Sequence, residues 1–298
     1  MSWSSLINIL FIALHAMVPI TLTAVGEIVG ETAGLFNIGL EGMLLLSAFM
    51  GVIGAEHAGP IVGLLVGAGT GALVGLVFSI ISTYWKGNQM ITGIGINLFA
   101  AGAVAYSFVV LGRPGYRLLD AADRLPAIRT PSGGLSPIIF VAILVPFLVY
   151  WFLKRTRAGL ILKAAGEAPE AADVAGINVN RMRLLATTFG GLLAGLAGAY
   201  MSISWVGSVT KGLSAGRGFI SLAIVVFSGL NPILALVGGF IYGIFQSLAI
   251  WIKNTPGITF LPWQVFDMLP YIVTLLVVAG VIGRVRFPKA LGTPYKRE

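Results

Sequence analysis

The sequence predicts an all-α fold, a polytopic membrane helical bundle of about nine transmembrane helices with one short polar helix in a connecting loop. The mean hydropathy is +0.95 and only 10% of the residues are charged, against about 25% in soluble globular proteins. The apolar runs are continuous rather than alternating, which favours helices over a β-barrel in lipid. At roughly 20 residues per span, the chain holds about eight to ten spans and no separate aqueous catalytic domain.

Nine apolar runs define the expected spans of a single transmembrane domain, residues 1–298. The first run is expected to be a retained helix, because it lacks the basic stretch and cleavage site of a signal peptide. The expected spans are Leu6–Thr23, Gly42–Ala55, Pro60–Tyr84, Met90–Leu111, Pro137–Leu153, Leu184–Ile203, Phe219–Gly229, Pro232–Ile252 and Met268–Gly283.

Lys and Arg residues predict the orientation, because loops rich in them stay on the cytoplasmic side. If the spans alternate, twelve basic residues fall on one side and five on the other. The loop 154–183 is then cytoplasmic and the loop 112–136 extracytoplasmic, with the N-terminus outside and the C-terminus inside. This bias accounts for the net charge of +8 without nucleic-acid binding.

Glycines at steps of four residues predict close helix packing. Gly63, Gly67, Gly71 and Gly75 share one face of the third span. Without Cβ atoms on that face, a neighbouring backbone can approach closely, and van der Waals contact drives helix association in lipid. Shorter ladders of small residues occur at Gly191, Gly195 and Gly198, and at Gly239 and Gly243.

Two Gly-rich stretches interrupt the apolar pattern. Residues 26–42 contain Glu27, Glu31 and Glu41, and residues 205–219 contain Lys211 and Arg217. A charge at membrane depth is costly, so residues 26–42 are either a discontinuous element that lines a transport path or an ordinary solvated loop. Residues 205–219 are either a re-entrant or unwound turn or a periplasmic loop that touches a partner protein. Polar groups expected at membrane depth along such a path are Glu31, Asn37, Glu41, Asn97 and Arg217.

The residues do not support a metal site, a serine hydrolase or an ATP-binding site. The chain has no cysteine, only two histidines and no HExxH motif, so we expect neither a metal site nor a catalytic residue. Gly212–Gly216 matches G-x-S-x-G, but no histidine follows it as the hydrolase order requires. No G-x-x-x-x-G-K-[ST] motif occurs, so the chain is not expected to bind ATP in a P-loop.

The basic loop 154–183 contains a compact helix signature. Pro169 suits a first turn, acidic residues lie toward the N-terminal end, and Gly176 is a typical C-terminal stop. The Ala-rich face of this helix is too weakly apolar for lipid but suits a groove on another protein. The acids are Glu167, Glu170 and Asp173, and the small face is Ala168, Ala171, Ala172 and Ala175.

The segment Glu170-Ala-Ala-x-x-x-Gly176 is similar to the EAA loop by which permease subunits of ATP-binding cassette (ABC) importers dock on their ATPases. Four further stretches resemble the branched-chain amino acid and simple-sugar permease family, and most of all its nucleoside and simple-sugar branch. They are residues 37–42, 189–199, 217–223 and 291–298.

The resemblance implies a permease subunit of the cell membrane that binds no cofactor itself, with ATP and Mg on separate cytoplasmic ATPase subunits. It also implies a second related permease, as a heterodimer or a homodimer, and an extracytoplasmic binding protein that selects the solute. The implied ATPase-coupling residues in the cytoplasmic coupling helix are Gly166, Glu167, Glu170, Ala171, Ala172, Asp173 and Gly176.

A nucleoside is the expected solute, and a simple sugar such as ribose or galactose is the alternative within the same family. Two other classes are open on the residues alone. Glu27, Glu31 and Glu41 could be ion-coupling groups of a secondary transporter, and a membrane scaffold would transport nothing.

Overall fold

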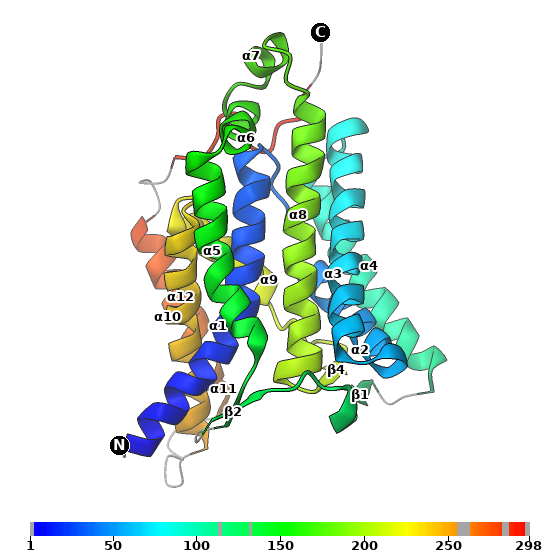
Figure 1. Cartoon of the computed structure of the whole chain (residues 1–298), viewed down its shortest axis with the longest axis vertical. Helices are drawn as coiled ribbons and strands as arrows, with labels where there is room; N and C mark the ends of the chain where they lie inside the picture. Colours follow the sequence, from blue (N-terminus) through cyan, green and yellow to red (C-terminus); the bar gives the residue numbers. More distant parts are fainter. Residues whose placement is uncertain (1–2, 113–114, 131–132, 255–262, 282–285, 296–298) are drawn as a thin grey trace.

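The computed structural model describes residues 3–112, 115–130, 133–254, 263–281 and 286–295. They form an elongated helical bundle with the chain termini at opposite ends (Figure 1). The described α-helices are α1 Trp3–Thr32, α2 Leu40–Ala58, α3 Pro60–Ser79, α4 Gln89–Val110, α5 Pro137–Arg155, α6 Arg157–Glu167, α7 Pro169–Val174, α8 Val179–Tyr200, α9 Arg217–Ser228, α10 Pro232–Lys253, α11 Trp263–Asp267 and α12 Leu269–Val281.

The predicted polytopic bundle is confirmed, and each expected span has a helical counterpart. Seven described helices are long and apolar enough to cross a membrane, and the apolar helical stretches Arg217–Ser228 and Gln264–Leu276 are shorter. Two spans end in π-helical turns, η1 Ile80–Tyr84 after α3 and η3 Met201–Trp205 after α8. Such turns change the direction of the chain at the end of a helix, while their backbone groups still form i→i+5 hydrogen bonds.

The first helix differs from the prediction at its C-terminal end. It was expected to stop at Thr23 but continues to Thr32, and it buries Glu27 and Glu31, which are 2% and 1% exposed. The interpretation of residues 26–42 as a solvated loop is therefore wrong. The break comes later, at residues 33–39, because the helix can carry these acids where other helices cover them.

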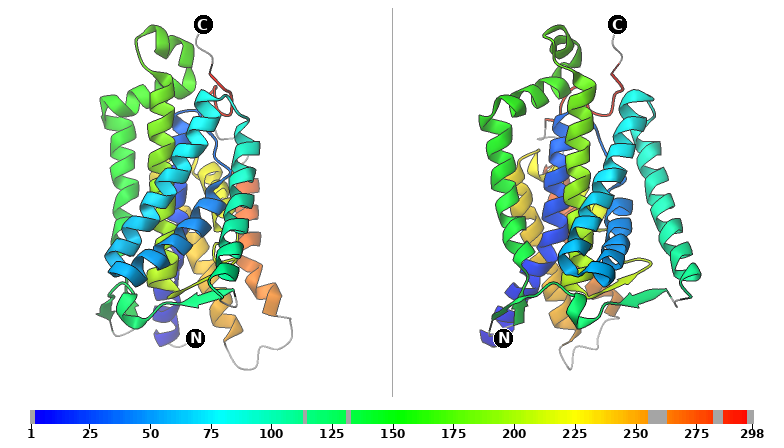
Figure 2. Two further views of the ribbon diagram at one scale, coloured as in Figure 1. Left: turned by 90° about the vertical axis from the view of Figure 1, so that its right-hand side faces the viewer. Right: turned by 45° about the vertical axis from the view of Figure 1, so that its right-hand side comes forward.

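The two ends of the bundle differ in structure. One end, here the α7 end, carries α6, α7 and the C-terminal residues (Figures 1 and 2). The opposite end, here the strand end, carries a short 3-10 turn, η2 Ala121–Asp123, and two small antiparallel sheets. In these, β1 Tyr116–Leu118 pairs with β4 Ser208–Thr210, and β2 Ile128–Thr130 pairs with β3 Gly133–Leu135. The predicted loop 112–136 thus contains ordered strands, one of which is tied to α2 by an Arg117–Glu56 ion pair.

Helices α1 and α8 are the centre of the bundle, and α8 packs on α3 through the predicted glycines. A Cβ atom added at Gly71 would lie 2.6 Å from the backbone nitrogen of Gly195, and one added at Gly75 would lie 3.1 Å from the Cα of Gly191. These helices therefore touch backbone to backbone, as the glycine ladders predicted. In the Gly239–Gly243 ladder of α10, Gly243 meets the backbone of α1 in the same way, whereas Gly239 lies against the Thr21 side chain.

A methyl group at this contact should loosen the bundle. We expect Gly71→Ala to destabilise the protein by about 1–3 kcal/mol, because a backbone has no rotamer by which to avoid the added carbon. The effect is measured as the melting temperature of the detergent-solubilised protein, with size-exclusion chromatography as the readout of the folded fraction after heating. Gly69→Ala is the matched control, since nothing lies within 4 Å of a Cβ at Gly69 on the same helix. Equal melting temperatures for the two variants would contradict this packing.

Candidate translocation site

Two helices begin inside the bundle rather than at its ends. After α1 ends at the α7 end, residues 33–39 (the link) lead back into the bundle, and α2 starts at Leu40 in the half nearer the strand end (Figure 2). Helix α9 starts at Arg217. The two starts touch, since a Cβ at Gly218 would lie 2.6 Å from the Cα of Glu41. Each start has backbone N–H groups that need partners from outside its own helix.

The Glu41 side chain supplies partners for the start of α9. Its Oε1 accepts a hydrogen bond from the backbone N–H of Gly216 at 2.7 Å, and its Oε2 accepts one from Gly218 at 2.8 Å. Gly216 is the N-cap of α9, has a φ of 76° and offers no side chain of its own. A carboxylate in this position also meets the positive end of the α9 dipole. Glu41 therefore joins α2 to α9.

Two asparagines hold the start of α2. The Asn97 side chain, from α4, accepts from the N–H of Gly42 at 2.7 Å and donates to the Ile38 carbonyl at 2.9 Å. Asn37 accepts from the N–H of Gly39 at 2.9 Å through its side chain. The predicted path residues Asn37, Glu41 and Asn97 are thus brought together, and their side chains bond to backbone.

The Arg217 side chain lies at the start of α9. Its Nη1 donates to the carbonyls of Leu213 and Ser214 at 3.2 and 3.3 Å, and the guanidinium lies 5.1 Å from the centre of the Trp205 ring. Its Nε is buried and has no hydrogen-bond partner among the described residues. The Nε–H of Arg217 is therefore a buried donor for a group that the described chain does not supply.

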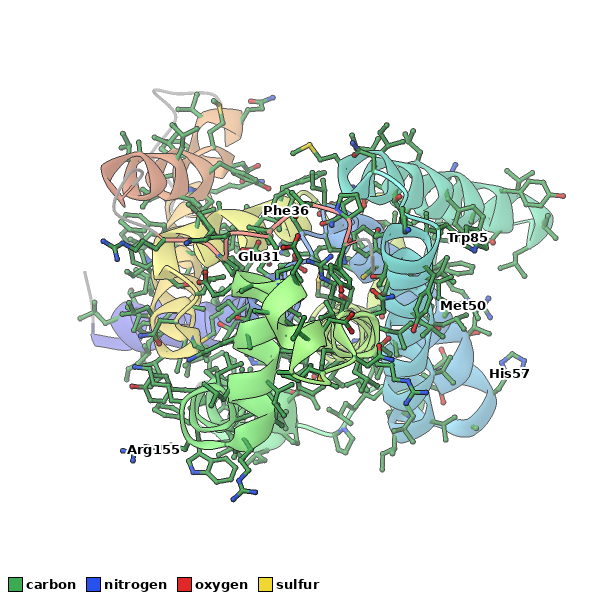
Figure 3. All side chains as sticks on the ribbon, turned by 90° about the horizontal axis from the view of Figure 1, so that it is seen from above. Glu31, Phe36, Met50, His57, Trp85 and Arg155 are labelled. Atoms are coloured by element: carbon green, nitrogen blue, oxygen red, sulfur yellow. The ribbon has the colours of Figure 1, made fainter. Side chains whose placement is uncertain are left out.

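Glu31 is separate from this cluster. Figure 3 looks from the α7 end and places Glu31 and Phe36 in the interior, with Arg155 and His57 at the rim. Both carboxylate oxygens of Glu31 are buried without a hydrogen-bond partner in the described part of the chain. Glu27, one turn earlier, accepts from the backbone N–H of Asn37 at 2.7 Å. Of the two α1 acids, Glu27 is thus bonded to the link.

A polar pocket of about 230 Å³ lies between α10, α11 and α12. It adjoins the α9 start, because the Tyr271 hydroxyl donates to the Ala215 carbonyl at 2.8 Å. The Gln246 side-chain oxygen is buried and unpartnered within the described residues. The pocket is lined by Tyr242, Gln246, Ala249, Ile250, Asp267, Pro270 and Tyr271.

Sequence reasoning missed Tyr242, Gln246 and Tyr271. A signal existed for Gln246, which is the one amide side chain in the apolar run Pro232–Ile252. The tyrosines gave no signal, because an aromatic residue in an apolar run is ordinary for a membrane helix.

The predicted coupling residues fall on α6, α7 and the turn after α7. Gly176 ends α7 with a φ of 83°, the left-handed conformation expected of a C-terminal stop. Glu167, Glu170 and Ala171 are exposed and Asp173 is half-buried. Gly166 and Ala172 are buried instead. Gly166 lies against Ala33 at the end of α1, and Ala172 packs with Ala165 and Val179. These two buried residues position α7 rather than form its outer surface.

The model of the family described as branched-chain amino acid transport system / permease component matches residues 8–278. The chain belongs to this family. Its members are permease components of transport systems, so the family supports the importer class over the ion-coupled alternative. No solved structure matched the chain.

Relatives match over most of their length. The guanosine ABC transporter permease protein NupQ of Bacillus subtilis is 33% identical over 93% of this chain and 92% of its own. The nucleoside ABC transporter permease protein NupC of Lactococcus lactis is 31% identical, with 93% of each chain covered. TsgC13 of Haloferax volcanii, named for glucose ABC transport, is 30% identical over 95% and 96%. NupP, a second guanosine permease of Bacillus subtilis, is 24% identical over 90% and 80%.

Removing the Glu41 carboxylate should disturb both interior helix starts. We expect Glu41→Ala to lower transport about tenfold or more, because the N–H groups of Gly218, which is buried, and Gly216, which is half-buried, lose their acceptor at a cost of about 1–3 kcal/mol for a buried group. Solute uptake into proteoliposomes measures the loss, and gel filtration verifies assembly. Glu41→Gln is the matched variant: it keeps one acceptor oxygen and should retain more transport than alanine. Equal uptake by wild type and Glu41→Ala would rule out this role.

Proposed function

We propose that this chain is one permease subunit of an ABC importer that moves a nucleoside across the cell membrane. The observation that carries the proposal is the pair of helices that begin inside the bundle, beside a polar pocket. In transporters, helices interrupted at membrane depth offer backbone groups and dipole ends to a solute that has left water. The pocket adds tyrosine rings and an amide, which suit a solute with a flat base and several hydrogen-bonding edges.

The polar groups at the site also offer hydrogen bonds to a nucleoside. The Glu41 carboxylate is bonded to the amides of α9, and Arg217 is partly bonded to carbonyls. A ribose hydroxyl could accept a hydrogen bond from the unpartnered Nε of Arg217. The nucleoside permeases among the relatives support this choice of solute.

We propose that α7 docks on a cytoplasmic ATPase, which places the α7 end of the bundle in the cytoplasm. The α7 surface is open, since Val174 is 91% exposed and Glu170 is exposed. Because the sequence has no P-loop motif, ATP and Mg would bind to that partner. Closure of the ATPase subunits would then move α7 and rock the bundle between its two openings.

We propose two further partners. The face of α4 beside Asn97 exposes Ile94, Leu98 and Phe99, and a second permease would cover it and close the path. The occurrence of two guanosine permeases among the Bacillus subtilis relatives favours a heterodimer over a homodimer. An extracytoplasmic binding protein would deliver the solute at the strand end, where β1, β2 and β3 lie.

A simple sugar is the second candidate solute. The relative named for glucose transport supports it, and tyrosine rings pack on sugar rings as well as on bases. The two candidates differ in their hydrogen-bonding edges, because only a nucleoside presents a base to Gln246. A panel of labelled nucleosides and sugars therefore separates them.

The importer should take up a labelled nucleoside only with ATP. The complex with its ATPase and binding protein is reconstituted in liposomes, and guanosine, adenosine, ribose and glucose uptake are compared. We expect Gln246→Leu, which keeps the side-chain size and removes the amide, to lower nucleoside uptake about tenfold, as for one lost buried hydrogen bond of roughly 1.4 kcal/mol. Uptake of sugars alone would select the second candidate, and uptake without ATP would contradict the importer class.

Reversing a charge on α7 should disturb docking without unfolding the chain. We expect Glu170→Lys to lower ATPase stimulation and uptake together, since Glu170 is exposed and its change leaves the core untouched. Gly176→Pro should have a larger effect, because proline cannot adopt the φ of 83° found there. The matched control is Arg155→Glu, an exposed charge reversal at the rim of the same end (Figure 3). Normal coupled turnover in Glu170→Lys would reject docking at α7.

A further inference from the structure

Arg183 is a buried cation whose partners are all backbone carbonyls. Its side chain is 0% exposed, although the sequence placed it in a basic surface loop. Its Nε donates to the Ala33 carbonyl at 3.2 Å, Nη1 to the Thr293 carbonyl at 2.9 Å and Nη2 to the Ala290 carbonyl at 3.5 Å. Burying a guanidinium is costly unless its donors are used. Here they join the start of α8 to the end of α1 and to the C-terminal residues.

The C-terminal residues 286–295 (the tail) lie across the α7 end of the bundle, pass α6 and end beside the start of α8 (Figure 1). The backbone N–H of Ala290 donates to the Gly166 carbonyl of α6 at 3.0 Å. The N–H of Gly292 donates to the Gly34 carbonyl in the link at 3.3 Å. The tail therefore bonds on one side to the helix before α7 and on the other side to the link.

The tail also contacts α7 directly. The Tyr295 hydroxyl donates to Oδ2 of Asp173 on α7 at 2.9 Å. The Tyr295 ring packs on the small cluster formed by Ala165, Ala172 and Val179. A helix of six residues is too short to be stable by itself, so α7 depends on these neighbours for its position. Displacement of α7 therefore acts on Tyr295.

From the link, hydrogen bonds continue to the candidate translocation site. The link begins at Ala33 and Gly34, which are bonded to Arg183 and to the tail. It continues through the Asn37 N–H, bonded to Glu27, to the start of α2. There Glu41 bonds to the start of α9. A continuous set of bonded elements thus connects α7 with both interior helix starts.

We propose that the tail and Arg183 are positioning elements that transmit a displacement of α7 to the link, and through it to the helix starts of the translocation site. The proposal rests on the proposed docking of an ATPase at α7 and adds the route by which that docking reaches the solute path. Physical coupling of this kind requires connected elements that move together. The tail meets that requirement, because its backbone is bonded to α6, α8 and the link and its last described side chain is bonded to α7.

The first experiment separates coupling from stability. Tyr295→Phe and Asp173→Asn, singly and together, are made in the assembled importer, and ATP hydrolysis and solute uptake are measured on the same proteoliposomes. We expect uptake per ATP hydrolysed to fall by about threefold or more in each single variant, because each one removes or weakens the hydrogen bond between Tyr295 and Asp173. Tyr84→Phe, on η1 at the same end, is the control. A proportional loss of hydrolysis and uptake would mean that the tail only stabilises the fold, and would overturn the proposal.

The second experiment does not depend on the solute or on the ATPase. Hydrogen exchange is measured on the purified chain in lipid nanodiscs for wild type, Tyr295→Phe, Asp173→Asn and Tyr84→Phe. In wild type the amides of Phe36, Asn37 and Gly39 in the link are hydrogen-bonded. We expect both tail variants to speed their exchange by about threefold or more, with no change in β4 at the strand end.

Arg183→Gln should have a larger effect on the same amides, and the milder tail variants keep the test valid if it does not fold. Faster exchange in the tail with unchanged exchange in the link would overturn the proposal. Failure of the wild-type complex to import nucleosides would instead count against the proposed function, and the exchange result would still decide whether the tail and the link are coupled.

Discussion

The shared hydrogen bonds of Glu41 are the interaction on which the rest of the site depends. A membrane interior offers no water to backbone groups, so a helix can begin there only if protein groups accept its first N–H bonds. Glu41 does this for α9 from the first turn of α2, and Asn97 holds the start of α2. Because each helix start depends on the other, the two interrupted elements form one unit. The pocket lined by Tyr242, Gln246 and Tyr271 opens beside that unit.

The helices α3 and α8 beside this unit are held together by backbone packing and not by hydrogen bonds of side chains. The glycine faces of α3 and α8 bring two backbones into contact, which maximises dispersion contacts where no hydrophobic effect between helices operates. The α4 side is much less buried within the chain, with 28% of its span covered against 78% for α1. The protein therefore combines a closely packed centre, which contains α3 and α8, with an exposed side at α4. The interior helix starts lie between these two regions.

The sequence was sufficient for the apolar spans and insufficient for their tertiary partners. Continuous apolar runs predicted every span, because length and hydropathy are local properties. The end of α1 was placed too early, since Glu27 looks like the end of a span until α8 and the link cover it. The pairing of Glu41 with Gly216 joins residues 175 positions apart, and no pattern in one sequence indicates it. Arg183 resembled its basic neighbours for the same reason, because its three acceptors are main-chain atoms that any residue carries.

The acceptors of Arg183 have a consequence for how this part of the protein can vary. A carbonyl group is present at every position, so replacing the side chains of Ala290 or Thr293 removes none of the bonds to the guanidinium. Inserting or deleting a single residue would instead shift the carbonyls along the chain by about 3.3–3.6 Å, more than the length of a hydrogen bond. Near Ala290 and Thr293 the tail is thus constrained in length more than in composition, as a spacer of fixed size would be.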